Sequence, residues 1–156
     1  MIHISIPSYK DIKIKNVVFD YNGTLATDGI VDTDIKNKLK VLQKKVDIYV
    51  LTADTYGNVA KNLADTKLKV HIISKENGTD DKANFVRKLG SSTCIAVGNG
   101  NNDSLMIKEA EIGICIIGNE GCSTKALFNS QIVFKSINDC LELLLNTNRL
   151  IATLRG

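Results

Sequence analysis

One stretch decides the fold of this chain: Val17-Val18-Phe19-Asp20-Tyr21-Asn22-Gly23-Thr24-Leu25. The apolar run predicts a buried strand over residues 16–20 that delivers Asp20 to its carboxyl end. Gly23 permits a sharp turn there and lets backbone N–H groups approach an oxyanion closely, and Thr24 adds a hydroxyl. Open α/β sheets bind ligands beyond the carboxyl ends of their strands, so the stretch predicts an anion site beside Asp20.

Three later segments place polar side chains in the same way. Residues 48–54 (Ile-Tyr-Val-Leu-Thr-Ala-Asp) form a second apolar run that ends in a hydroxyl. Lys82 opens a helical stretch over residues 81–89. Residues 94–103 (Cys-Ile-Ala-Val-Gly-Asn-Gly-Asn-Asn-Asp) form a further apolar run that ends in amides and a carboxylate. Each polar group lies at a predicted strand end or helix start, where such sheets bind ligands.

Together the four segments resemble the four motifs of the haloacid-dehalogenase-like (HAD) superfamily. Residues 20–24 resemble its Asp-x-Asp-Gly-Thr motif, in which the first Asp is the nucleophile of phosphoryl transfer. Residues 51–54 are similar to the Leu-Thr-Gly-Asp of P-type ATPases, and residues 98–103 resemble Gly-Asp-Gly-x-Asn-Asp. The resemblance covers residues 16–103 and implies an α/β fold with a doubly wound parallel sheet, the HAD-like Rossmannoid fold. It also implies a Mg²⁺-dependent phosphohydrolase or phosphotransferase.

The resemblance implies a role for each polar residue. Asp20 would attack phosphorus and form an aspartyl-phosphate, while Asp103 would orient a metal-bound water or Lys82, or cap a helix. Asp54 either caps the second helix or supports the site. The implied sets are catalytic Asp20, Asn22 and Lys82; phosphate-binding Gly23, Thr52, Ala53, Lys82 and Asn102; and metal-binding Asp20, the backbone carbonyl of Asn22, Asn99 and Asp103.

Two asparagines depart from the family motifs. Asn22 stands where most HAD phosphatases have the Asp that protonates the leaving group, and an amide cannot exchange a proton at neutral pH. The loss of general acid–base help typically costs about 10²–10⁴-fold in rate. Asn99 removes one negative charge from the expected Mg²⁺ site. Both changes predict a slow enzyme, and they leave open a catalytically weakened phosphate-binding or regulatory interaction module on the same fold.

Composition limits the other functions. The chain has 156 residues, 44% of them hydrophobic and 24% charged, which is ordinary for a globular protein. A net charge of +3 with 5% aromatic residues and no Trp argues against nucleic-acid binding. No apolar run approaches the roughly 20 residues that span a bilayer, so we expect no membrane partner and no ion pump. The four cysteines show no metal-ligand spacing, and we expect a reduced, cytoplasmic protein.

The hydrophobic pattern predicts one domain over residues 1–156, with an N-terminal β-hairpin extension at 1–15. The predicted helix caps are Asp32 or Thr33, Asp80 and Ser136. The last segment, Thr147–Leu154, either adds a helical turn or packs across the sheet. The predicted strands are 16–20, 46–52, 69–74, 93–98, 111–117 and 131–135, and the predicted helices are 33–45, 56–65, 80–89, 102–110, 122–129 and 136–146.

The spacing between motifs leaves no room for a cap domain, which many HAD enzymes insert, and none for a segment that would recognise adenine. A soluble ATPase is therefore less favoured than a phosphatase that acts on a small phosphorylated substrate. Residues 24–34 form either a small flap hairpin or a plain surface loop. The N-terminal hairpin packs on its own sheet, or else the hairpin or the flap covers the open site of a partner. In the second case the protein is a homo-oligomer, a dimer or tetramer.

Overall fold

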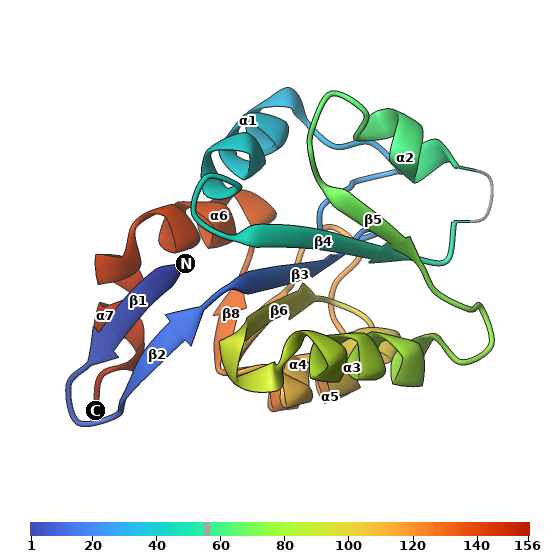
Figure 1. Ribbon diagram of the computed structural model, residues 1–156. Coiled ribbons are helices and arrows are strands. Elements are labelled where there is room, and N and C mark those ends of the chain that lie inside the picture. The colour runs from blue at the N-terminus through green and yellow to red at the C-terminus, as the bar shows by residue number, and fades with distance from the viewer. Residues whose placement is uncertain (55–56) are drawn as a thin grey trace.

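The computed structural model describes residues 1–54 and 57–156. Within them, six parallel strands form one sheet in the order β5-β4-β3-β6-β7-β8, with helices on both faces (Figure 1). The α/β doubly wound prediction is therefore confirmed. The strands are β3 (Asn16–Asp20), β4 (Asp47–Thr52), β5 (Lys69–Ile72), β6 (Cys94–Gly98), β7 (Ile112–Ile116) and β8 (Ile132–Phe134).

Alternate residues of each central strand face opposite sides of the sheet, as the pleat of a β-strand requires. In β3, Val17 and Phe19 belong to one hydrophobic core and Val18 belongs to the other. All five residues of β3 are buried, which is why this strand appears in the sequence as a continuous apolar run and not as an alternation. Packing on both faces of the sheet therefore fixes the position of Asp20 at the carboxyl end of β3.

The helices follow the predicted order, and all but α3 are shorter than predicted: α1 (Thr33–Leu42), α2 (Asn58–Asn62), α3 (Gly78–Leu89), α4 (Ser104–Glu109), α5 (Thr124–Asn129) and α6 (Ile137–Leu145). Short 3-10 turns, η1 (Ser91–Thr93) and η2 (Asn101–Asp103), precede β6 and α4. The predicted start of the second helix at residue 56 lies outside the described residues. The Ser136 cap is confirmed, since its hydroxyl accepts from the Asp139 amide.

The predicted cap at Asp80 is wrong. Helix α3 begins two residues earlier, at Gly78, and Asn77 occupies the N-cap position. Gly78-Thr79 resembles a loop in sequence, yet the helix accommodates both residues. Lys82 is consequently the fifth residue of α3 and lies one turn inside the helix. Asp32 does occupy the N-cap position of α1, although its side chain makes no capping bond.

The N-terminal hairpin pairs β1 (Ile2–Ile6) with β2 (Lys10–Ile14) in antiparallel register. Its apolar face is buried in the core of the same chain, where Ile2, Ile4, Ile6, Ile12 and Ile14 join residues of β3, α6 and α7 (Thr147–Leu154). The last segment is thus a helix, and Figure 1 shows it beside β1 at the end of the sheet where β3 begins. The hairpin packs within its own chain, far from the carboxyl ends of the strands.

The connections around β4 hold no inserted domain in the described residues. Only α1 lies between β3 and β4, and only α2 and β5 lie between β4 and α3. Residues 24–34 include a minimal hairpin in which Thr27 and Ile30 exchange backbone hydrogen bonds of 3.0 Å across Asp28-Gly29. Both turn residues have positive φ, 52° and 80°, as a two-residue hairpin turn requires. Among the described residues, no helix has the length and apolar character needed to cross a membrane.

Candidate active site

The candidate site lies at the carboxyl ends of three neighbouring strands. Asp20 is the last residue of β3, Thr52 is the last residue of β4, and Asn99 directly follows β6. The strand order reverses between β3 and β6, so Asp20 and Asn99 flank the topological switch point, where sheets of this kind bind ligands. Residues that are 79 positions apart in sequence are thereby brought together by the fold.

Lys82 lies on α3, and its side chain reaches the carboxyl end of β3. Its Nζ lies 2.5 Å from Asp20 Oδ1 and 2.6 Å from Asp103 Oδ1. The Lys82 side chain is only 1% exposed, and Asp103 is fully buried. A lysine at this depth is rare unless it is paired, because burial penalises its charge. Lys82 is therefore a buried, paired lysine and not a solvated surface residue.

Asp103 holds the site together from η2. Its second oxygen, Oδ2, accepts hydrogen bonds of 2.9 Å from the backbone amides of both Asn99 and Gly100. Gly98 makes this approach possible, because a Cβ on Gly98 would lie 2.5 Å from Asp103 Cβ and Cγ. Both Asp103 oxygens are thus engaged, one by Lys82 and one by the loop after β6. This geometry matches the expected orientation of Lys82, while direct metal ligation by Asp103 stays a prediction.

The two carboxylates and one ammonium set the local electrostatics. Burial, followed by the negative charge of Asp103, raises the pKa of Asp20 to about 7, against the lowering effect of Lys82 and Thr24. Burial also lowers the pKa of Lys82, but Asp20 and Asp103 together outweigh it and leave this pKa above its ordinary value. Lys82 is therefore charged at neutral pH, and the buried cluster favours an additional positive charge beside Asp20.

A divalent cation fits the residues on the other side of Asp20. The Thr24 hydroxyl lies 3.2 Å from Asp20 Oδ2 and 3.3 Å from Asn99 Oδ1, so oxygens from two strand ends converge on one point. Carboxylate and amide oxygens are ligands that suit Mg²⁺. Within residues 1–54 and 57–156, no group of three or more His, Cys, Asp and Glu side chains could hold a metal. A site at this point would therefore rely on Asn99 and a backbone carbonyl as well as Asp20.

Gly23 lies in the turn that follows Asp20. It has φ of 77°, and a Cβ there would lie 2.5 Å from Glu120 Oε2 and 2.6 Å from Asn99 Nδ2. The positive φ favours glycine, and a side chain here would also crowd the Asn99 amide. The Gly23 amide donates to the Ala26 carbonyl at 3.0 Å, so the structure commits it to the turn. Its predicted contact with a phosphoryl oxygen conflicts with that bond, because one N–H cannot serve both fully.

The other predicted phosphate-binding residues differ in position. Thr52 is buried, and its Oγ1 accepts from the Asp54 amide at 3.2 Å, which leaves the hydroxyl proton to donate. Asn22 and Ala53 line a cavity of about 380 Å³ next to the site. Asn102 is exposed on η2. The Asp54 carboxylate accepts from the Val59 amide at 2.8 Å, so it caps the start of α2.

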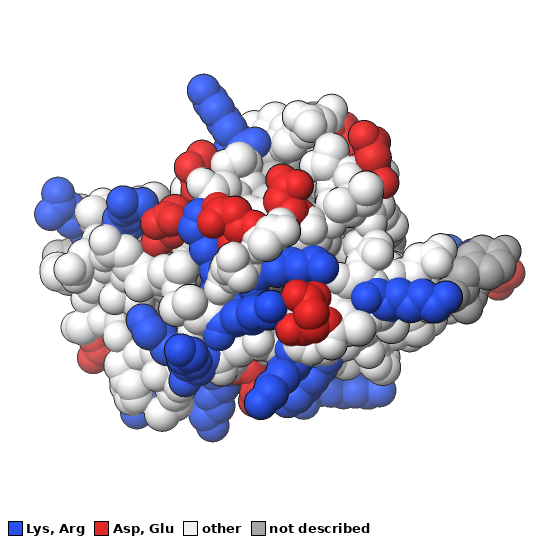
Figure 2. Space-filling view, turned by 90° about the horizontal axis from the view of Figure 1, so that it is seen from above, with Lys and Arg blue, Asp and Glu red and all other residues white. Residues whose placement is uncertain are grey.

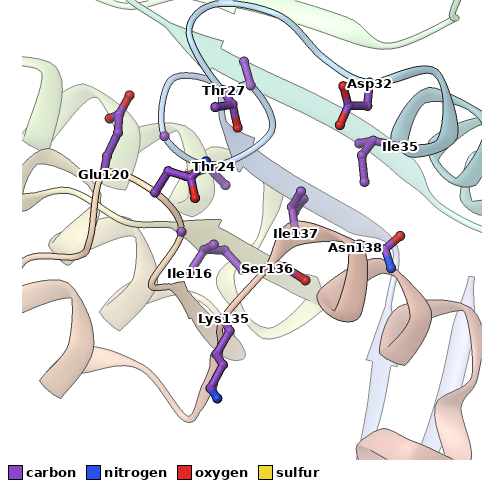
Figure 3. Close-up of a pocket in the computed structure, with 14 residues that line it drawn as sticks. Thr24, Thr27, Asp32, Ile35, Ile116, Glu120, Lys135, Ser136, Ile137 and Asn138 are labelled. Atoms are coloured by element: carbon purple, nitrogen blue, oxygen red, sulfur yellow. The ribbon is translucent and has the colours of Figure 1, made fainter.

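A second cavity, of about 220 Å³, lies on the opposite side of the Gly23 turn, between that turn and the loops after β7 and β8. Figure 3 shows Glu120 on the loop that faces Thr24, whereas the amine of Lys135 points away from the other labelled residues. Sequence reasoning missed Glu120. The available signal was weak: Gly118 and Gly121 bracket a turn directly after the apolar strand, and the turn places Glu120 at this sheet edge.

No protein-family model matches the chain. Two proteins of Methanocaldococcus jannaschii are similar to parts of it. The uncharacterized protein MJ0073 is 61% identical over 61 residues, which are 39% of this chain and 66% of that protein. The uncharacterized protein MJ0072 is 44% identical over 39 residues, which are 25% of this chain and 89% of that protein.

Solved structures resemble nearly the whole chain. One is 3-deoxy-D-manno-octulosonate 8-phosphate phosphatase from Moraxella catarrhalis with magnesium, phosphate and KDO, at 20% identity and a TM-score of 0.65 over 91% of this chain and 94% of that chain. Another is a HAD superfamily (subfamily III A) hydrolase from Legionella pneumophila, at 15% identity and a TM-score of 0.68 over 89% and 87%. The chain therefore has the HAD-superfamily fold, and it belongs to the same sequence family as MJ0072.

Proposed function

We propose that this protein is a Mg²⁺-dependent phosphohydrolase that works through an aspartyl-phosphate on Asp20. The observation that carries the proposal is the buried cluster at the switch point, in which Lys82 lies 2.5 Å from Asp20 and 2.6 Å from Asp103. A carboxylate at a ligand-binding sheet edge, with a buried ammonium beside it, is suited to attack phosphorus while the phosphoryl charge is neutralised.

The first step forms a bond between an Asp20 oxygen and phosphorus and breaks the bond from phosphorus to the leaving oxygen. Oδ1 accepts from Lys82 and Oδ2 accepts from the Thr24 hydroxyl, so the two oxygens have different partners. Lys82 and the Thr52 hydroxyl would stabilise the phosphoryl oxygens during transfer. In the second step a water attacks phosphorus, releases inorganic phosphate and restores the Asp20 carboxylate.

Asp20 Oδ2, Asn99 Oδ1 and the Asn22 carbonyl would hold Mg²⁺. A bound Mg²⁺ would neutralise phosphoryl charge and favour ionised Asp20. The neighbouring phosphatase from Moraxella catarrhalis contains magnesium and phosphate, which supports the proposal by analogy of fold.

Asn22 limits what this site can hydrolyse quickly. Since an amide supplies no proton, the leaving oxygen must take one from water or leave as an anion. Acyl and aryl phosphates tolerate this, whereas alkyl phosphates do not. We therefore propose small phosphorylated substrates with good leaving groups, and slow turnover of ordinary phosphate monoesters.

Surface charge supports a small-molecule partner. On the face shown in Figure 2, acidic side chains lie among lysines and arginines. Two lysines of α1, Lys36 and Lys40, both pair with Asp65. A single-sign surface that would attract nucleic acid is not what this face presents. We propose a cytoplasmic location from the reduced cysteines, which are all free thiols.

A phosphate-binding or regulatory module is the second candidate, and Asn22 with Asn99 is the observation that favours it. Both positions weaken catalysis more than they weaken anion binding. A site that binds phosphate but never turns over would need Lys82 and Thr52, yet it would not need a nucleophile.

The test measures release of inorganic phosphate from acetyl phosphate and p-nitrophenyl phosphate, with Mg²⁺ and with EDTA. We expect Mg²⁺-dependent turnover by the wild type and none by Asp20→Asn. Asp47→Asn is the matched control, because Asp47 begins β4 at the opposite end of the strand from Thr52 and its carboxylate pairs with exposed Lys69. Full activity in Asp20→Asn would contradict the proposal. Phosphate binding without turnover would favour the second candidate.

A further inference from the structure

We infer that Glu120 supplies the negative charge that Asn99 lacks at the cation site and holds the Asn99 amide in the orientation that binds the cation. This inference rests on the proposed function. It concerns a residue outside the four motif segments, on the loop between β7 and α5.

The loop is built against the Gly23 turn. The Gly121 amide donates to the Gly118 carbonyl at 3.0 Å, which closes a tight turn with Glu120 inside it. The Ser123 amide donates to the Asn99 carbonyl at 2.8 Å, so the end of this loop is tied to the residue after β6. These bonds hold the backbone on either side of Glu120 in place beside the site.

The Glu120 carboxylate lies beside the Gly23 turn, on the side where the Asn99 amide nitrogen lies. Its Oε2 and the Asn99 Nδ2 lie 2.5 Å and 2.6 Å from the same point, the position of a Cβ on Gly23. The Asn99 Nδ2 also donates to the Gly121 carbonyl at 3.3 Å, while the Asn99 Oδ1 accepts from the Thr24 hydroxyl at 3.3 Å. A carboxylate on the Nδ2 side favours this orientation of the amide, because the amide nitrogen is positive and its oxygen is negative.

Charge provides the second argument. An Asp at position 99 would place a carboxylate oxygen against the Gly121 carbonyl and near Glu120, both of which are negative. Asn99 with Glu120 carries the same total charge as an Asp there with a neutral residue at 120. Glu120 is exposed, so its effect on a cation is partly screened by solvent.

The test measures binding of Mn²⁺, which takes the same oxygen ligands as Mg²⁺, from the electron paramagnetic resonance signal of the free ion. We expect Glu120→Gln and Glu120→Ala each to weaken binding by about 3- to 10-fold at low ionic strength. The loss should shrink in about 0.5 M KCl, since an exposed charge acts through solvent. Asn99→Asp combined with Glu120→Gln returns the charge to the site on a buried ligand, so it should bind Mn²⁺ at least as tightly as the wild type.

Glu109→Gln is the matched control, because Glu109 ends α4 at the opposite sheet edge and pairs with exposed Arg87. Thermal unfolding of each variant checks that the fold is intact. Equal affinity in Glu120→Gln and Glu109→Gln, while Asp20→Asn abolishes binding, would overturn this inference alone. A wild type that binds no Mn²⁺ would overturn the proposed cation site and this inference with it.

Discussion

The carboxyl edge of the central sheet, where its strands end, and the amino edge, where they begin, bury different kinds of side chain. At the carboxyl edge, Asp20, Lys82 and Asp103 form a buried charged cluster. At the amino edge, the isoleucines of the β1–β2 hairpin and Leu150 of α7 are buried among other apolar side chains. Buried charge stabilises a fold poorly, whereas apolar burial stabilises it well. The comparison indicates that the carboxyl edge holds the charged site, and that apolar burial at the amino edge offsets the free energy that burying those charges costs.

The largest expected effect is a loss of activity from a substitution that alters only the carboxyl edge. Asp20→Asn removes the proposed nucleophile, so phosphate release should fall by about 10³-fold or more. The amino edge is untouched, and the variant should remain folded by circular dichroism. Turnover close to that of the wild type would show that another group attacks phosphorus.

The next expected effect is a gain of activity when position 22 receives a side chain that can donate a proton. Asn22→Asp should raise the rate on alkyl phosphates by about 10²-fold, with a smaller gain on p-nitrophenyl phosphate, because only the former needs a proton on its leaving group. The measurement compares kcat on both substrate classes. Equal gains would mean that proton transfer does not limit the rate. Intact mass must be verified first, since the Asn22-Gly23 and Asn99-Gly100 pairs are prone to deamidation.

A smaller expected effect is a loss of stability from a substitution that alters only the amino edge. Ile14 is fully buried at the end of β2, and Ile14→Val removes one methyl group from the core. We expect about 0.5–1.5 kcal/mol of lost unfolding free energy in urea titrations, with kcat unchanged for the folded fraction. A change in kcat with stability preserved would mean that the two edges are coupled.

The last expected effect is a pH dependence of stability at the carboxyl edge. The pKa of Asp20 is raised to about 7 from 3.8, so the folded protein holds this proton more tightly than the unfolded chain. Stability from this group is present below pH 4 and is lost as pH rises through 7. In EDTA, raising the pH from 5 to 8 should therefore lower the melting temperature of the wild type more than that of Asp20→Asn, because the amide of the variant does not ionise. A gap in melting temperature between the two proteins that is independent of pH would contradict the raised pKa.

Much of the carboxyl edge could be predicted from the sequence, because parallel strands bring their ends together. The strand ending at Asp20 has the predicted bounds, and the order of elements follows the prediction. The depth of Lys82 could not be predicted, since it depends on α3 starting at Gly78 and packing against α4. Glu120 escaped because it lies in a turn whose position depends on the tertiary fold. At the amino edge, the period-2 isoleucines predicted the hairpin but not which surface would bury it.

The central claim is that Asp20 carries the phosphoryl group during turnover. The most direct measurement incubates the protein with acetyl phosphate and Mg²⁺, quenches it in acid, where acyl phosphates persist, and maps the phosphate by peptide mass spectrometry. We predict phosphate on the peptide that contains Asp20 in the wild type and in Asp47→Asn, and none in Asp20→Asn. Turnover without any modified peptide, or phosphate on another residue, would contradict the account.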